Sequence, residues 1–234
     1  MLSNILKTFL FLLLALSISS NDIFAEERKM KKTILIGASI GERWDFKDLP
    51  NRINLENVSF VYLSHYEKNS FEKSLKIAAE GDSVILKLCA VNFRVYEEGD
   101  YDENFNTNKN QVISWVNTLK NHKIEPILAT VVPITQDIPL YYKLRHYIKK
   151  YILFRDAKVY DRKSTLSLIG RFNDWQKTYA KENGLRVLDL ESAVRVSDSS
   201  RELKDGFSTD GLHLNSAGYK ALDQLANVFF KQDS

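Results

Sequence analysis

Two short motifs hold residues that together could carry out acyl-transfer chemistry. The first is GASIG at residues 37–41, in which small residues flank Ser39 and could expose its hydroxyl on a tight turn. The second is DGLH at residues 210–213, in which Asp210 precedes His213 by three positions and can bond to its imidazole. The carboxylate would hold one ring nitrogen as a donor and leave the other free as a base. A serine, a base and an orienting acid are the parts of a serine hydrolase.

Each motif also has a plainer reading. Glycines after a strand often only make a turn, and Asp210 could cap a helix beside a surface histidine. The order Ser, Asp, His is also that of the α/β-hydrolases, whose nucleophile lies in G-x-S-x-G. Two features argue against that fold: Ser39 follows the first predicted strand, and Asp210 and His213 share one turn.

The elements that must position these residues alternate between strand and helix. Five short apolar runs predict strands buried on both faces, at residues 33–39, 58–64, 83–91, 126–134 and 185–190. Between them, apolar residues recur at spacings of three and four, which is typical of helices packed on a core. These stripes are residues 112, 116 and 119; 168, 172, 175 and 179; and 222, 225 and 229. Gly184 is expected to end one helix and Asn215 to begin another.

The alternation predicts an α/β three-layer α/β/α sandwich around a five-stranded, mostly parallel sheet. Ligands of such sheets bind beyond the carboxyl ends of the strands, where both motifs are expected. Trp44, just past the serine turn, is expected either to line that site or to face solvent.

The composition is that of an ordinary globular protein. The 234 residues include 33 Lys and Arg and 30 Asp and Glu, and 44% are hydrophobic, which excludes a disordered chain and a multi-span membrane protein. A net charge of +3 does not require nucleic acid as a partner. The single cysteine, Cys89, excludes an internal disulfide and is expected to be a buried, inert thiol. The four histidines lack metal-ligand spacing, and acyl transfer by a serine needs neither a metal nor an organic cofactor, so no cofactor is expected.

Residues 1–25 predict a secretory signal peptide. The apolar run at residues 9–19 is too short to span a bilayer, and Ala25 is a suitable cleavage point. This leaves residues 26–234 as a single domain and predicts a periplasmic or secreted protein. Because basic residues follow the run, an uncleaved anchor and an internal start at Met30 stay open.

A serine directly after the first strand and a D-x-x-H near the C-terminus resemble the SGNH/GDSL hydrolases, over about residues 33–231. The segment DGLHLNSAGY at residues 210–219 is the most specific part of the resemblance. The resemblance implies a flavodoxin-like fold, with Ser39 as nucleophile, His213 as general base and Asp210 as its orienting partner. It also implies an oxyanion hole made by the serine amide, a glycine after the second strand and an asparagine after the third.

The sequence departs from the family at that oxyanion hole. No glycine lies in SHYEKNS at residues 64–70, after the second predicted strand. After the third strand, the family's G-x-N-D reads CAVN at residues 89–92, so Asn92 is the remaining candidate. We therefore expect the Ser39 amide and the Asn92 side chain to hold the oxyanion. Loss of one donor typically costs about 10²–10³ in rate, so a slow enzyme or a silent one is also compatible.

The resulting prediction is an exported serine esterase that acts on acyl esters, with O-acetylated saccharides as one candidate, through a covalent acyl-enzyme. Two alternatives stay open: a polysaccharide O-acetyltransferase with the same residues, and a catalytically silent glycan- or surface-binding domain of the same fold. Residues 141–163 are basic and aromatic, which suggests contact with an anionic glycan or a membrane surface. A helix with a solvated basic face would have the same composition.

Overall fold

A computed structural model describes residues 30–136, 144, 147–148 and 160–232. The fold is carried by the compact unit Lys31–Ser234. The predicted signal peptide and most of the basic, aromatic stretch at residues 141–163 lie outside the described residues. No helix among the described residues has the length and hydropathy needed to cross a membrane.

Five strands form one parallel sheet, as predicted. They are β1 (Lys31–Gly37), β2 (Val58–Ser64), β3 (Ser83–Lys87), β4 (Glu125–Ala129) and β5 (Arg186–Leu188). Their order across the sheet is β2-β1-β3-β4-β5, and all four pairings are parallel. This is the flavodoxin-like order, in which the strand sequence reverses beside β1 and ligands bind at that switch point.

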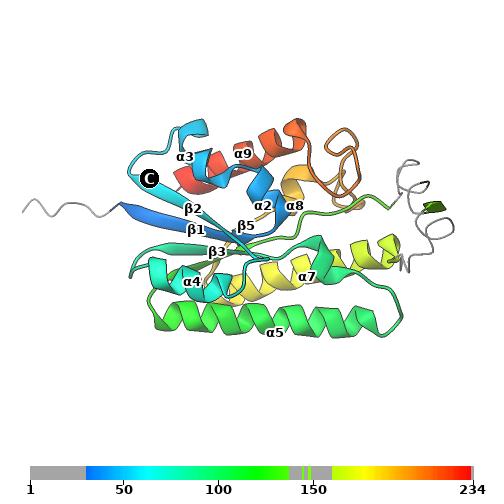
Figure 1. Cartoon of the computed structure of the whole chain (residues 1–234), viewed down its shortest axis with the longest axis horizontal. Coiled ribbons are helices and arrows are strands. Elements are labelled where there is room, and N and C mark those ends of the chain that lie inside the picture. The colour runs from blue at the N-terminus through cyan, green and yellow to red at the C-terminus, as the bar shows by residue number, and fades with distance from the viewer. Residues whose placement is uncertain (1–29, 137–143, 145–146, 149–159, 233–234) are drawn as a thin grey trace, which may run out of the picture. The chain divides into compact units, whose positions relative to one another are not determined.

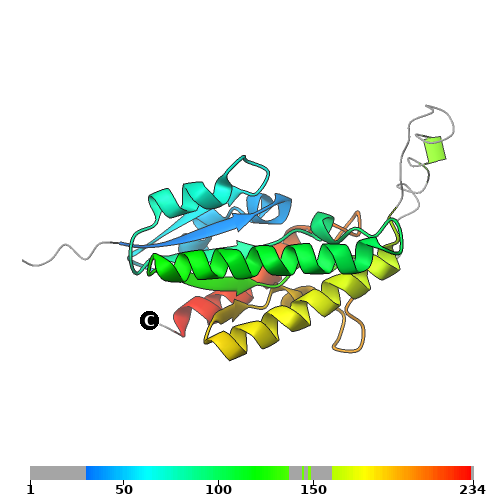
Figure 2. The same ribbon diagram turned by 90° about the horizontal axis from the view of Figure 1, so that it is seen from below.

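Helices cover both faces of the sheet, which confirms the predicted three layers (Figures 1 and 2). One face carries α4 (Ser70–Ile77), α5 (Asp100–Asn121) and α7 (Arg162–Asn183). The other carries α2 (Ser39–Arg43), α3 (Leu49–Arg52), α8 (Leu190–Val194) and α9 (Ser216–Lys231). Side chains of β1 alternate between the two layers, so that Ile34 and Ile36 pack on the first face and Leu35 on the second.

The predicted helical stripes are confirmed. Their residues lie on α5, α7 and α9 and are buried in, or packed against, the two cores. Gly184 ends α7 with a φ of +62°, a conformation that glycine adopts without strain. Asn215 begins α9, and its side-chain oxygen accepts hydrogen bonds from the amides of Ala217 (3.0 Å) and Gly218 (3.2 Å).

The third and fourth predicted strands are too long. β3 ends at Lys87 rather than residue 91, because the chain then turns into a 3-10 helix, η2 (Ala90–Phe93). β4 ends at Ala129 rather than residue 134, although the irregular segment beyond it is also buried. In that segment, the side chain of Asn173 on α7 accepts from the Val131 amide (2.8 Å) and donates to its carbonyl (2.9 Å). A side chain thus replaces the strand partner that a buried backbone needs.

Trp44 neither lines the predicted site nor faces solvent. It is 2% exposed, and its ring nitrogen donates to Asp223 on α9 at 2.7 Å. Its ring also packs against Phe46 of a second 3-10 helix, η1 (Phe46–Asp48). The chain that follows Ser39 is thereby fastened to α9.

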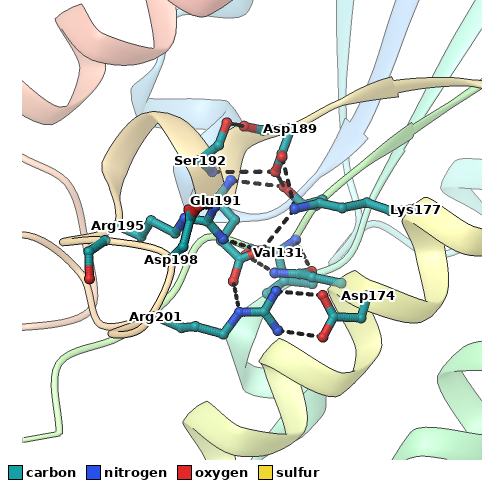
Figure 3. A network of polar contacts seen from close by, with 12 residues as sticks. Val131, Asp174, Lys177, Asp189, Glu191, Ser192, Arg195, Asp198 and Arg201 are labelled. Atoms are coloured by element: carbon teal, nitrogen blue, oxygen red, sulfur yellow. Dashed lines mark hydrogen bonds and ion pairs between the residues drawn. The ribbon is translucent and has the colours of Figure 1, made fainter.

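A buried carboxylate joins α8, α7 and the loop that precedes the second motif (Figure 3). Glu191 is 0% exposed, and its oxygens form ion pairs of 3.2–3.9 Å with Lys177, Arg195 and Arg201. Arg201 also binds Asp174 on α7 through two hydrogen bonds, of 2.8 and 2.5 Å. It passes so close to Gly170 that a Cβ there would lie 2.8 Å from a guanidinium nitrogen.

Removal of this carboxylate should destabilise the fold, because three cations would lose their shared counter-charge. We expect Glu191→Ala to lower the free energy of unfolding in urea by about 3–5 kcal/mol. Asp198→Ala is the matched control, since its side chain is 92% exposed and also pairs with Arg195. The control should change stability by less than about 0.5 kcal/mol. Equal effects of the two substitutions would contradict this role for Glu191.

Candidate active site

Both motifs contribute to one pocket at the carboxyl-terminal edge of the sheet. The pocket has a volume of about 140 Å³ and is lined by Ser39, Ile40, Tyr66, Cys89, Ala90, Val91, Arg94, Leu212 and His213. These residues come from α2, the loop after β2, the segment after β3 and the turn before α9. Their meeting follows from the parallel sheet, whose strands all end at this edge.

Other hollows and side-chain clusters of the described residues are weaker candidate sites than this pocket. A larger hollow of about 450 Å³ lies between α3 and α9 and contains none of the predicted site residues. Within residues 30–136 and 160–232, no cluster of three or more His, Cys, Asp or Glu side chains could hold a metal ion. The small pocket is therefore the candidate active site.

Asp210 and His213 make the contact that their spacing predicts. Asp210 Oδ2 lies 2.7 Å from His213 Nδ1, and Oδ1 accepts from the backbone amides of Leu212 (2.9 Å) and His213 (2.7 Å). Burial favours the neutral acid, but the bond to the imidazole and those from the amides outweigh it and lower the pKa of Asp210. An ionised Asp210 holds a proton on Nδ1 and leaves Nε2 available as a base.

A buried arginine fastens this turn to the rest of the molecule. Arg162, the first residue of α7, is 8% exposed. Its Nη2 donates to the Gly211 carbonyl at 2.5 Å and its Nε to the Thr135 carbonyl at 2.7 Å. The Thr135 amide donates to the same Gly211 carbonyl at 3.1 Å. Gly211 has a φ of +71°, and a Cβ there would collide with the Thr135 side chain. The turn thus needs glycine for both its conformation and its close approach.

Ser39 begins α2, two residues beyond the end of β1. The first amide that bonds within this helix is that of Glu42, which donates to the Ala38 carbonyl at 3.2 Å. The Ser39 amide therefore has no acceptor inside the helix, as expected of a first-turn residue. Ser39 and His213 share the pocket without a direct hydrogen bond. Catalytic hydrogen bonds are often long in free enzymes and tighten when substrate binds.

The structure does not bring Asn92 to the pocket. Its side-chain oxygen accepts from the Cys89 amide at 3.1 Å, and its carbonyl accepts from the side chain of Asn108 on α5 at 3.0 Å. A 3-10 helix has about three residues per turn, so successive side chains of η2 point in different directions. Val91, and not Asn92, therefore lines the pocket. The placement does not support Asn92 as an oxyanion donor. Cys89 is buried, as expected, but it lines the pocket.

Three cations at or near the pocket, Arg94, Arg162 and Lys87, are not among the site residues predicted from sequence. Lys87 ends β3 and is 2% exposed, and among the described residues its ammonium bonds only to the Leu88 carbonyl, at 3.4 Å. Burial lowers the pKa of Lys87, while nearby Cys89 opposes that shift. Its one sequence signal is a lysine inside the otherwise apolar run SVILKLCAV. Arg162 has no such signal, because Thr135 and Gly211, whose carbonyls it binds, are distant in the chain.

Residues 94–221 match the GDSL-like lipase/acylhydrolase family, so the protein belongs to this family. The matched segment includes Asp210 and His213 and begins after Ser39. None of the curated proteins matches the sequence.

Several solved structures share the fold. A GDSL-like lipase from Bacteroides thetaiotaomicron is 17% identical, with a TM-score of 0.57 over 93% of this chain and 96% of its own. A proposed acylhydrolase from Bacteroides fragilis is 18% identical, with a TM-score of 0.57 over 88% and 89%. A member of the lipolytic G-D-S-L family from Veillonella parvula is 16% identical, with a TM-score of 0.54 over 86% and 99%. At these identities the likeness concerns the fold alone.

A pair of glycine substitutions tests the anchoring of the second motif. Gly206 and Gly211 both have positive φ, of +82° and +71°, but a Cβ has open space at Gly206 and collides at Gly211. We expect Gly206→Ala to cost about 1 kcal/mol of unfolding free energy through backbone strain. Gly211→Ala should cost about 1–3 kcal/mol more, through overpacking. Equal losses in urea denaturation would show that the turn is not held as described.

Replacement of Lys87 should stabilise the protein in a pH-dependent way. Because its pKa is lowered in the folded state, the unfolded chain binds more protons between that lowered pKa and the ordinary 10.5. The amount by which Lys87 lowers the free energy of unfolding therefore falls as pH rises through this window. We expect Lys87→Met to raise the unfolding free energy more at about pH 7 than at about pH 10. Lys76→Met, at an exposed position on α4, should show no such trend. An increase in unfolding free energy that is the same at both pH values would contradict a lowered pKa of Lys87.

Proposed function

We propose that this protein hydrolyses acyl esters through Ser39, with His213 as general base and Asp210 as its orienting partner. The observation that carries the proposal is the shared pocket of Ser39 and His213, with Asp210 2.7 Å from the far nitrogen of the imidazole. Membership of the GDSL-like lipase/acylhydrolase family supports ester hydrolysis in general.

The reaction would proceed in two halves. His213 Nε2 removes the Ser39 proton as the hydroxyl oxygen attacks the ester carbonyl, and the oxyanion rests against the Ser39 amide. The tetrahedral intermediate expels the alcohol, which takes its proton from His213, and an acyl-serine remains. Water then attacks this acyl-enzyme with His213 again as base, and the acid is released. A sugar hydroxyl in place of water would make the protein an O-acetyltransferase, with the same three residues.

A silent glycan- or surface-binding domain is the second candidate. The placement of Asn92, whose side-chain oxygen is bonded to the Cys89 amide outside the pocket, favours it. Without a second oxyanion donor, the rate would fall by about 10²–10³ relative to a complete site. Activity that is low but dependent on Ser39 would still support the enzyme.

Kinetics with a short p-nitrophenyl ester separate these candidates. We expect Ser39→Ala and His213→Ala each to lower kcat by about 10³-fold or more, and Asp210→Asn by about 10²–10⁴. Ser114→Ala is the matched control, because Ser114 is exposed on α5, on the opposite face of the sheet from α2. Equal rates for wild type and Ser39→Ala would contradict the proposal. Added saccharide that captures the acyl group faster than water would favour the transferase.

We also propose that residues 1–25 direct export of the protein. The apolar run at residues 9–19 and Ala25 support a cleaved signal peptide. We expect the exported form of a C-terminally tagged chain to begin at residue 26, as measured by intact mass. A chain that keeps residue 1, or one that starts at Met30, would contradict cleavage. Contact of residues 141–163 with an anionic glycan or a membrane surface stays a prediction.

A further inference from the structure

Arg94 is the one Lys or Arg among the described residues that line the candidate active site. It directly follows η2, and its carbonyl accepts a hydrogen bond from the side chain of Asn104 on α5 at 2.8 Å. Its guanidinium lies over the ring of Tyr160, with Cζ 5.0 Å from the ring centroid. The backbone bond and the ring contact hold Arg94 at the pocket.

No carboxylate neutralises the guanidinium of Arg94 in the part of the chain that the structure describes. Other arginines of this protein do pair with acids: Arg52 with Asp223, Arg171 with Asp102, and Arg201 with Asp174. The residues that line the pocket include neither Asp nor Glu. The acid behind the pocket, Asp210, is already bonded to His213. The donors of Arg94 are therefore available to an anion beside Ser39.

Two cations, Arg94 and Lys87, act on side chains at this edge, where the carboxylates of Glu42 and Glu67 also act on Tyr62. Burial and Cys89 raise the pKa of Tyr66, another pocket residue, and the positive charge of Arg94 opposes them. Burial lowers the pKa of His65, and so does the charge of Lys87 beneath the edge. Of these two cations, Lys87 is buried beneath the edge and only Arg94 lines the pocket, so Arg94 is the one that a bound substrate can reach.

We propose that Arg94 binds an anionic group of the substrate, so that the preferred esters carry a carboxylate or a phosphate close to the scissile bond. This inference rests on the proposed esterase function and adds the substrate class to it. A guanidinium suits either anion, because its planar donors match two oxygens at once. The alternative is that Arg94 has only a packing role, against the ring of Tyr160. In that case the charge of Arg94 would not affect which ester the protein prefers.

Two pairs of esters test the proposal and separate the sources of the anion. The mono-4-nitrophenyl ester of succinic acid is compared with 4-nitrophenyl butyrate, which lacks the acyl-side carboxylate. An acetylated sugar phosphate is compared with the acetylated sugar, which lacks the alcohol-side phosphate. We expect wild type to prefer the anionic member of at least one pair by about tenfold or more in kcat/KM. No preference in either pair, with the neutral esters still hydrolysed, would overturn the inference and leave the esterase proposal intact.

Charge variants assign any preference to Arg94. Arg94→Gln should abolish it mainly through KM, so that kcat/KM falls about tenfold more on the anionic ester than on the neutral ester of the same pair. Arg94→Lys should keep part of it, whereas the loss of packing on Tyr160 would be similar in both variants. Arg43→Gln, which removes the same charge from an exposed position outside the pocket, should keep all of it. Equal losses from Arg43→Gln and Arg94→Gln would overturn the role of Arg94.

Direct binding makes the inference independent of turnover. Monomethyl succinate and inorganic phosphate are titrated calorimetrically into Ser39→Ala protein with and without Arg94→Gln, at constant ionic strength. We expect the affinity for at least one of these anions to fall by about tenfold or more in the double variant. Unchanged affinities would overturn the inference even if no ester were hydrolysed.

Discussion

The parallel alignment of the strands is the constraint on which the candidate site depends. Ser39 follows β1, Arg94 lies beyond β3, and the turn with His213 precedes α9, so all three are far apart in the chain. Parallel strands send these segments to the same edge of the sheet, whereas antiparallel neighbours would send successive ones to opposite edges. The order β2-β1-β3-β4-β5 also places the Ser39 turn at the reversal beside β1. The topology brings the segments of the pocket together, and local hydrogen bonds fix the positions of their side chains.

The helix α7 controls the position of the second motif within that frame. Its first residue, Arg162, binds the carbonyl of Gly211, and Asn173 holds the buried backbone of Val131. Further along, Asp174 and Lys177 join the network around Glu191, which fixes the loop ahead of the turn. Through these contacts α7 holds three segments: the turn at Gly211, the segment after β4 at Val131 and the loop at Arg201. Arg162, Asn173 and Glu191 are buried, so another arrangement of these segments would lose the hydrogen bonds and ion pairs that they form here.

Much of the fold could be predicted because its signals are local or periodic. Strands buried on both faces leave apolar runs, and core-facing helices leave stripes with spacings of three and four. The contact of Asp210 with His213 was predictable for the same reason, since three positions separate them within one turn. The ends of β3 and β4 were not, because apolar residues continue beyond the strands into buried turns.

The composition of the pocket was less predictable. The position of Asn92 depends on the 3-10 turn that carries it, and a family motif shifted by one residue gives no sign of the side chain's direction. Arg94 and Arg162 acquire their partners only through tertiary contacts, with Tyr160 and Gly211 respectively. The protein has many other Lys and Arg residues, and the residues adjacent to these two in the sequence give no sign of their role.

The most direct test of the account is labelling of the protein with a fluorophosphonate probe, read by peptide mass spectrometry. The probe reacts with serines whose hydroxyl is activated by a base and whose oxyanion is stabilised. We predict a label on Ser39 that is lost in His213→Ala. A folded protein that takes no label, or a label on Ser39 that is independent of His213, would contradict it.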